Sequence, residues 1–243
     1  MPIFHDITKS GNDDRLLGAR IANEVRNAIL SGEMQPGMRV GQELLAKEFG
    51  TSRIPVREAL KQLESEGLVT LAPNRRAWVA DFNSEEFVEI YKIREVLDPL
   101  AIFESVPHLT DADIAVLDAT ARQLDQAETI EEYIQLDRQF HLRSYSRAPM
   151  PQLLAIVERF WNTTQHFRRQ FLQRVLAAEG LPFSDPQHLL LTDAIRAHDA
   201  EAARSIVYLH IRRTRLAIQT MEGISHRSGG IPPMRRERRR QGR

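Results

Sequence analysis

Residues 50–70 constrain the fold most, because they carry the start signal, the apolar stripe and the stop signal of one short helix. Thr51 or Ser52 can cap its first turn, and Pro55 is tolerated there because no intrahelical N–H is needed. Gly67 ends the pattern as a C-terminal cap does. One face carries apolar residues at three- and four-residue spacing: Val56, Leu60 and Leu63. The stretch therefore predicts a short amphipathic helix that begins directly after a turn.

Arg53 and Arg57 lie four residues apart at the start of this helix, so both side chains leave the same face near its positive end. Two guanidinium groups in that position suit phosphate oxygens, or the O6 and N7 edge of guanine, which arginine contacts with two hydrogen bonds. The alternative is a solvated helix with two surface arginines. The segments on either side favour the first interpretation.

Two further helices are expected before this one. The first covers residues 16–31, and the second begins at Val40 and runs mainly from Gln42 to Phe49. The break at Gly50 and Thr51 separates the second helix from the helix that carries the arginines. The middle of this region is therefore a helix–turn–helix.

A small β-hairpin is expected to follow. Two β-prone runs, residues 68–71 and 77–80, flank a Pro-Asn turn and predict a hairpin whose tip carries Arg75 and Arg76. Three helices and a hairpin over residues 15–80 make a winged helix-turn-helix DNA-binding domain. In such a domain the second helix of the turn enters the major groove, and the wing contacts the backbone or the minor groove.

The domain also carries three characteristic runs of sequence: Ala28-Ile-Leu-Ser-Gly-Glu-Met-Gln-Pro-Gly37, Glu43-Leu-Leu-Ala-Lys-Glu-Phe-Gly50 and Ser52-Arg-Ile-Pro-Val-Arg-Glu-Ala-Leu60. These runs resemble the GntR family of bacterial transcription regulators. The resemblance implies that the arginines of the Ser-Arg-x-Pro-Val-Arg motif contact operator DNA. Two residues depart from the family pattern, which often has a basic residue at Glu43 and usually a glycine at Arg76. The DNA contacts that we expect come from Thr51, Ser52, Arg53, Arg57, Arg75 and Arg76.

Composition places the chain among globular proteins with two domains. Its 243 residues are 42% apolar and 27% charged, which is enough to form two separate cores. The absence of cysteine excludes disulfides and thiolate chemistry. Neither a signal peptide nor a membrane-spanning run is present in the sequence, so a cytoplasmic protein without a membrane partner is expected.

Residues 84–222 predict an all-α domain. Apolar residues recur at helical spacing in six stretches, and proline-, glycine- or aspartate-rich junctions separate them. Bundles of this kind can form ligand sites from side chains on facing helices. The six helices are expected over residues 85–103, 111–127, 130–147, 150–176, 186–197 and 199–221.

Four residues of this domain suit a divalent transition metal. Asp137 and His141 are four residues apart on one helix, while His188 begins the fifth predicted helix and His210 lies in the sixth. One carboxylate and three imidazoles can bind Zn²⁺, Ni²⁺ or Mn²⁺. The alternative is a surface hydrogen bond between Asp137 and His141, with the other histidines scattered by chance.

The same residues, in the same order, resemble the FCD effector domain of the FadR subfamily of GntR regulators, and six helices resemble its VanR-like branch. The resemblance implies that Asp137, His141, His188 and His210 bind the metal and that a small organic acid completes its coordination. It also implies that Arg94 pairs with the carboxylate of that effector. The alternative for Arg94 is a salt bridge to Asp98, four residues on.

Both ends of the chain are expected to be flexible. Residues 1–14 are polar, and residues 223–243 hold seven arginines and one glutamate without apolar periodicity. The basic tail predicts either non-specific attraction to DNA or a solubilising extension.

These features together predict a ligand-responsive transcription regulator rather than an enzyme. A homodimer would place two recognition helices on an operator with two-fold symmetry, and repression relieved by the effector is the commoner pattern among proteins that the sequence resembles. The first alternative is a regulator that senses the metal without an organic effector. The second is a metal-dependent enzyme, although no additional general base is evident.

Overall fold

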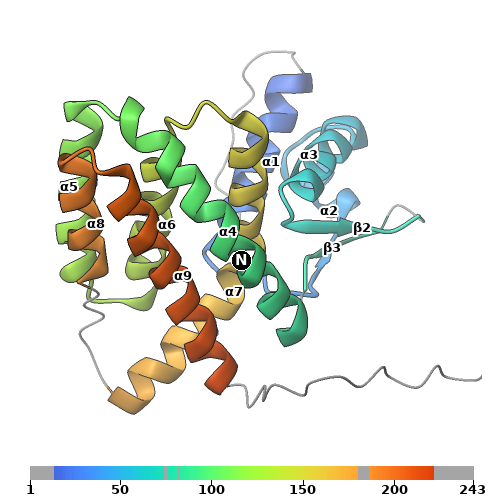
Figure 1. The fold of residues 1–243 in the computed structure, drawn as a ribbon. Helices are drawn as coiled ribbons and strands as arrows, with labels where there is room; N and C mark the ends of the chain where they lie inside the picture. Colours follow the sequence, from blue (N-terminus) through green and yellow to red (C-terminus); the bar gives the residue numbers. More distant parts are fainter. Residues whose placement is uncertain (1–13, 74–75, 82, 180–185, 222–243) are drawn as a thin grey trace, which may run out of the picture.

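The computed structural model describes residues 14–73, 76–81, 83–179 and 186–221. The described chain is mostly helical with one small sheet, as the sequence predicts, and it forms two hydrophobic cores. Figure 1 shows the helices and sheet of the N-terminal part on one side and the helical bundle on the other. The expected flexible N-terminus, apart from Asp14, lies outside the described residues, as do Arg75 and the basic tail.

The N-terminal part is a winged helix-turn-helix. Its elements are α1 (Asp14–Leu30), β1 (Arg39–Val40), α2 (Gln42–Glu48), α3 (Arg53–Ser65), β2 (Val69–Leu71) and β3 (Ala77–Val79). The strands are antiparallel in the order β1-β3-β2. Their core includes residues of all three helices, such as Ile21, Leu45 and Leu60.

One local prediction in this part is wrong. Val40 was expected to begin the second helix, but it lies in β1 and pairs with Ala77 of β3. Its side chain is buried, whereas Arg39 beside it is exposed, which is the alternation of a strand. A two-residue strand is too short for its alternation to be read from the sequence. The expected hairpin is therefore the larger part of a three-stranded sheet.

The ends of α3 follow from its local sequence, as expected. The Ser52 side chain caps the helix by accepting a hydrogen bond from the backbone N–H of Ile54. After the helix, Gly67 has a φ of +74°, a left-handed conformation that side chains rarely adopt. A Cβ at Gly67 would also lie 2.6 Å from Cγ2 of Thr163 on a helix of the bundle, so the glycine permits a close approach between the two parts.

The C-terminal part has six α-helices among its described residues, as predicted, and a short 3₁₀ turn (Val106–His108). They are α4 (Ser84–Ser105), α5 (Asp111–Asp125), α6 (Ile130–Tyr145), α7 (Pro151–Glu179), α8 (Gln187–Arg196) and α9 (Ala200–Met221). Asn83 and Thr110 form capping boxes at the starts of α4 and α5. No helix within the described ranges is long and apolar enough to cross a membrane.

Helix α7 connects the two parts by hydrogen bonds to backbone carbonyls at the ends of α1 and α3. Asn162 donates to the Glu66 carbonyl at 3.1 Å, and Arg169 donates to the Leu30 carbonyl at 2.6 Å. Figure 1 shows α7 beside α1 at the centre of the molecule. Since helix ends leave carbonyls without intrahelical partners, these contacts satisfy groups that would otherwise need water.

Candidate DNA interface and metal centre

A basic groove of about 710 Å³ lies on the N-terminal domain between α2, α3 and the sheet. It brings together three of the predicted DNA-contacting residues, Arg53, Arg57 and Arg76. Two further basic residues, Arg39 and Lys47, line the same groove and were not predicted. Lys47 follows Glu43 by four residues on α2, which is a signal that could have placed it on the same face.

The other predicted DNA contacts have different positions. Arg53 forms an ion pair with Glu43 at 2.7 Å, and both side chains are well exposed. Ser52 is exposed but its hydroxyl caps α3, and Thr51 is partly buried. Arg75 lies outside the described residues. The departure at Glu43 thus places a carboxylate directly against one of the two arginines that are predicted to contact DNA.

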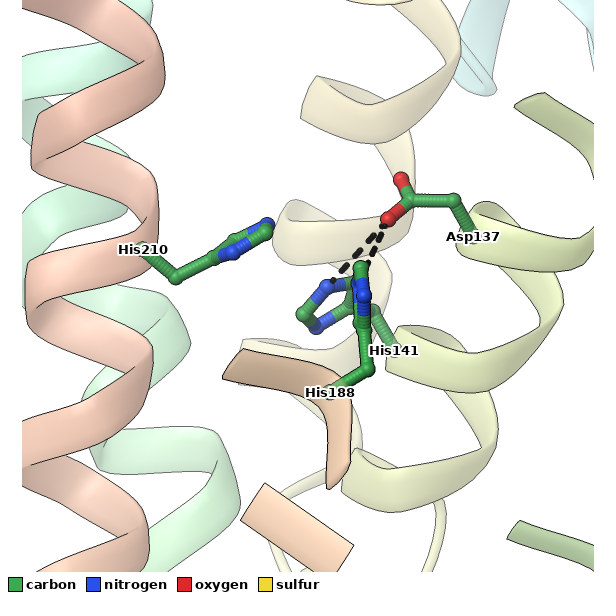
Figure 2. Close-up of side chains that lie close together, drawn as sticks. All are labelled: Asp137, His141, His188 and His210. Atoms are coloured by element: carbon green, nitrogen blue, oxygen red, sulfur yellow. Dashed lines mark hydrogen bonds and ion pairs between the residues drawn. The ribbon is translucent and has the colours of Figure 1, made fainter. Parts of the chain in front are cut away.

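The four predicted metal ligands converge in the core of the C-terminal domain. Asp137 and His141 come from α6, His188 from α8 and His210 from α9. One ligand atom from each lies within 4.8 Å of the others, and all four side chains are buried. Figure 2 shows the three imidazoles and the carboxylate pointing toward one another from three helices. This burial argues against the alternative of a surface hydrogen bond.

The two oxygens of Asp137 have different neighbours. Oδ1 faces the imidazoles, with Nε2 of His188 at 2.9 Å and Nε2 of His141 at 3.6 Å (Figure 2). Oδ2 accepts a hydrogen bond from Nη2 of Arg168, a residue of α7 that was not predicted. One oxygen is therefore directed toward the predicted metal position while the other is held by a cation outside it.

Burial and the neighbouring polar groups together set the charge of this cluster. Burial raises the pKa of Asp137, but Arg168 and the hydrogen bond with His188 more than compensate, so its pKa lies well below the usual range. Burial also lowers the pKa of His141 well below its usual value, although Asp137 opposes this shift. The carboxyl is therefore ionised and His141 neutral at neutral pH, which are the forms that bind metals.

The outer nitrogens of two histidines have partners that fix their orientation. The Tyr145 hydroxyl lies 3.2 Å from Nδ1 of His141, and Oε1 of Gln187 lies 3.3 Å from Nδ1 of His210. Nε2 of His141 is buried without a hydrogen-bond partner among the described residues. Buried polar atoms are rarely left in this state, so this atom suits a ligand. The residues present thus fit a divalent transition metal bound by three imidazoles and one carboxylate.

Arg94 is completely buried beside this cluster and forms the salt bridge to Asp98 that the sequence offered as the alternative, at 2.7 Å. Its guanidinium also lies over the ring of Trp161, with Cζ 4.1 Å from the ring centroid. Nη1 of Arg94 has no hydrogen-bond partner within the described part of the chain. The salt bridge therefore leaves one donor of Arg94 for a ligand.

Sequence reasoning missed Trp161 and Arg168, which complete this part of the core. Both lie on α7, in a stretch that contains several arginines and aromatic residues but no motif. Arg168 contacts Asp137 across 31 positions of sequence, and a contact between helices at that separation leaves no periodic signal.

Comparisons with known proteins agree with these two domains. A model described as bacterial regulatory proteins of the gntR family matches residues 17–79, and a model of the FCD domain matches residues 89–213. The transcriptional regulator McbR of Escherichia coli is 31% identical over 191 residues, covering 77% of this chain and 86% of McbR. The transcriptional repressor GlaR of the same organism is 27% identical over 195 residues, covering 77% of this chain and 89% of GlaR.

The solved structure described as E. coli McbR/YncC superimposes with a TM-score of 0.70 at 26% identity, covering 85% of this chain and 98% of that one. The matched domains and these relatives are those of transcription regulators, which confirms the prediction that the chain is not an enzyme. From the winged helix-turn-helix, the helical bundle and these matches, the chain belongs to the GntR family of DNA-binding transcription regulators, with an FCD domain at its C-terminal side.

Proposed function

We propose that this regulator is a homodimeric repressor whose FCD domain binds a divalent transition metal and a small carboxylate effector. The observation that carries the proposal is the buried set of Asp137, His141, His188 and His210, with ligand atoms within 4.8 Å of one another. Repression is supported by the names of two relatives, the repressor GlaR and the gluconate operon transcriptional repressor of Bacillus licheniformis.

Each residue of the site has a role in this proposal. Oδ1 of Asp137 and the three imidazoles hold the metal, while Arg168 holds Oδ2 of Asp137 and keeps the carboxylate oriented. The metal supplies positive charge and open coordination positions for an anionic oxygen. Arg94 contributes its Nη1 donor to the carboxylate of the effector.

Helix α7 offers a connection from this site to the DNA-binding domain. Arg168 contacts Asp137, and the next residue, Arg169, donates to the Leu30 carbonyl at the end of α1. An occupant that shifts α7 would therefore change how the DNA-binding domain is held. It alters DNA affinity only if it binds one arrangement better than the other.

A groove of about 800 Å³ between α4 and α9 supports the homodimer. Its large apolar side chains are exposed, with 66% of Val96 and 53% of Leu209 accessible. Its lining carries both charge signs, including Glu104, Glu201 and Arg204. Arg204 lies 3.6 Å from Glu201 of the same chain, so two copies related by a two-fold axis can exchange such pairs of opposite charge. The two recognition helices of such a dimer suit double-stranded DNA with two-fold symmetry.

The first test is the metal content of the purified protein, measured by mass spectrometry before and after chelation, with native mass on the same sample. About one transition ion per subunit in a dimer is expected. His141→Ala should lower the bound metal, whereas His166→Ala, outside the cluster, should not. A chain that neither contains metal nor takes it up on reconstitution would refute the metal site.

A second candidate, the metal sensor, is favoured by the completeness of the four-residue set. DNA affinity, measured by fluorescence anisotropy on a fragment obtained by in vitro selection, separates the two. A sensor responds to metal addition and chelation alone. The proposed effector-dependent repressor releases DNA only when a carboxylate is added to the metal-loaded dimer.

A further inference from the structure

Two arginines are buried in the core of the FCD domain, and each has a hydrogen-bond donor that is not satisfied by the described residues. Arg94 is 0% exposed and Arg168 is 6% exposed. Each is paired with one carboxylate, Asp98 for Arg94 and Asp137 for Arg168. Nη1 of each arginine is buried without a hydrogen-bond partner among the described residues. Since leaving a buried charged donor unsatisfied is costly, these two atoms mark a place for acceptors that the chain does not supply.

Both guanidinium groups lie against the same side chain. Cζ of Arg94 is 4.1 Å and Cζ of Arg168 is 4.6 Å from the ring of Trp161. The ring of His141 stacks on the same tryptophan, with centroids 5.1 Å apart, so the metal cluster also borders Trp161. Burial raises the pKa of Tyr91, and both arginines lower it, which is consistent with two cations close to one phenol. The two unused donors therefore belong to one region of the core.

The charges of this region indicate what kind of ligand it takes. Its charged side chains are two arginines and two aspartates, Asp98 and Asp137, so they cancel. A divalent metal on the proposed ligands would add two positive charges. A buried net charge is unfavourable unless it is compensated, and one dianion compensates it.

We infer that the effector is a short dicarboxylate, with one carboxylate on Arg94 and the other on Arg168. The inference rests on the proposed function, because it names the class of carboxylate that binds there. We assign a separate anionic group to each guanidinium because the two are held by different aspartates on different helices. A monocarboxylate satisfies only one of the two donors and leaves one charge uncompensated.

Isothermal titration calorimetry on the full-length, metal-loaded protein tests this with ligands of equal chain length. The pairs are succinate with butyrate and malonate with propionate. We expect at least one dicarboxylate to bind about tenfold or more tightly than its monocarboxylate partner, since a charge-assisted contact is gained. In Arg168→Gln the ratio of dicarboxylate affinity to monocarboxylate affinity should fall close to one, while monocarboxylate binding persists.

Two further variants control this experiment. Arg168→Lys keeps the charge and should retain part of the preference. Arg143→Gln removes an arginine that pairs with Asp113 away from this region, and it should leave the ratio unchanged. Thermal unfolding and metal content are measured on every variant, so that a folding defect is recognised. The wild-type ratio tests the inference even if Arg168→Gln does not fold.

The outcomes separate this inference from the proposed function. If the wild type binds both members of each pair equally, the inference of a dicarboxylate is wrong, while the proposal of a carboxylate effector is retained. A preference that survives in a folded Arg168→Gln protein overturns the role of Arg168. The absence of binding by all four acids, with metal present, overturns the dicarboxylate together with the carboxylate effector.

Discussion

Replacing Arg169 by methionine tests whether α7 holds the DNA-binding domain. Arg169 is 7% exposed, donates to the Leu30 carbonyl at 2.6 Å and pairs with Glu131 at 2.6 Å and 2.8 Å. It also packs on Gly32, where a Cβ would lie 3.1 Å from the Arg169 Cζ. Methionine keeps the apolar length of the side chain and removes the donors.

The expected loss follows from these contacts. A buried acceptor left without its partner costs about 1–3 kcal/mol, but Gln165 already lies 3.5 Å from the same carbonyl and can compensate in part. Glu131 is 44% exposed, so breaking its ion pair adds at most about 1 kcal/mol. We therefore expect Arg169→Met to lower the free energy of unfolding of the N-terminal domain by about 1–2 kcal/mol.

The two tryptophans of the chain make this loss measurable by domain, because Trp78 lies in β3 and Trp161 in α7. Urea unfolding followed by fluorescence in Trp161→Phe reports the N-terminal domain, and in Trp78→Phe the bundle. Arg143→Met is the matched control, since its ion pair with Asp113 is 3.5 Å long and partly exposed. If the urea midpoint reported by Trp78 shifts no more in Arg169→Met than in this control, the reasoning is refuted.

Two predictions concern other parts of the chain. Arg57→Ala removes a cation from the basic groove and should weaken DNA binding about tenfold and reduce its salt dependence. Lys61→Ala, on the same helix but outside the groove, should do neither. Anisotropy titrations at several salt concentrations check both variants. Hydrogen bonds from Arg147 and Thr110 lower the pKa of Asp113 to about 2. Because the pKa of an unfolded aspartate is about 3.9, Asp113 should stabilise the fold fully above that pH and lose this contribution as the pH falls toward 2. The difference in melting temperature between wild type and Asp113→Asn should therefore be constant above about pH 5 and narrow below it, and a difference that widens in acid would contradict this assignment.

The fold was predictable where the signals are local. The cap at Ser52, the left-handed Gly67 and the apolar stripes of the helices are each encoded within a few residues, and the structure has them as expected. Val40 was assigned wrongly because a two-residue strand owes its pairing to Ala77, which is distant in sequence. Local patterns thus specify helices and their ends, whereas short strands depend on their partners.

The candidate site was predictable only in part from the residues themselves. Spacing on one helix places Asp137 beside His141, but His188 and His210 come from other helices. Their residue type suits a metal, whereas the resemblance to the FCD domain is what implies that all four residues bind the same ion. Nothing in the sequence shows that Arg168 would be buried, because an arginine in a helix is usually exposed. Its burial depends on how α7 packs against α6, which is a property of the assembled core.

Two consecutive residues of α7 give the domain arrangement a physical basis for regulation. Neighbouring side chains on an α-helix point about 100° apart, so Arg168 reaches Asp137 in the core while Arg169 reaches the Leu30 carbonyl outside it. A rotation or shift of α7 cannot improve one contact without changing the other, because the backbone between them is a single helical step. An occupant that moves the backbone of α7 at Arg168 would therefore also alter the geometry at Arg169. This shared helix is why binding in the bundle and binding to DNA are expected to be energetically coupled rather than independent.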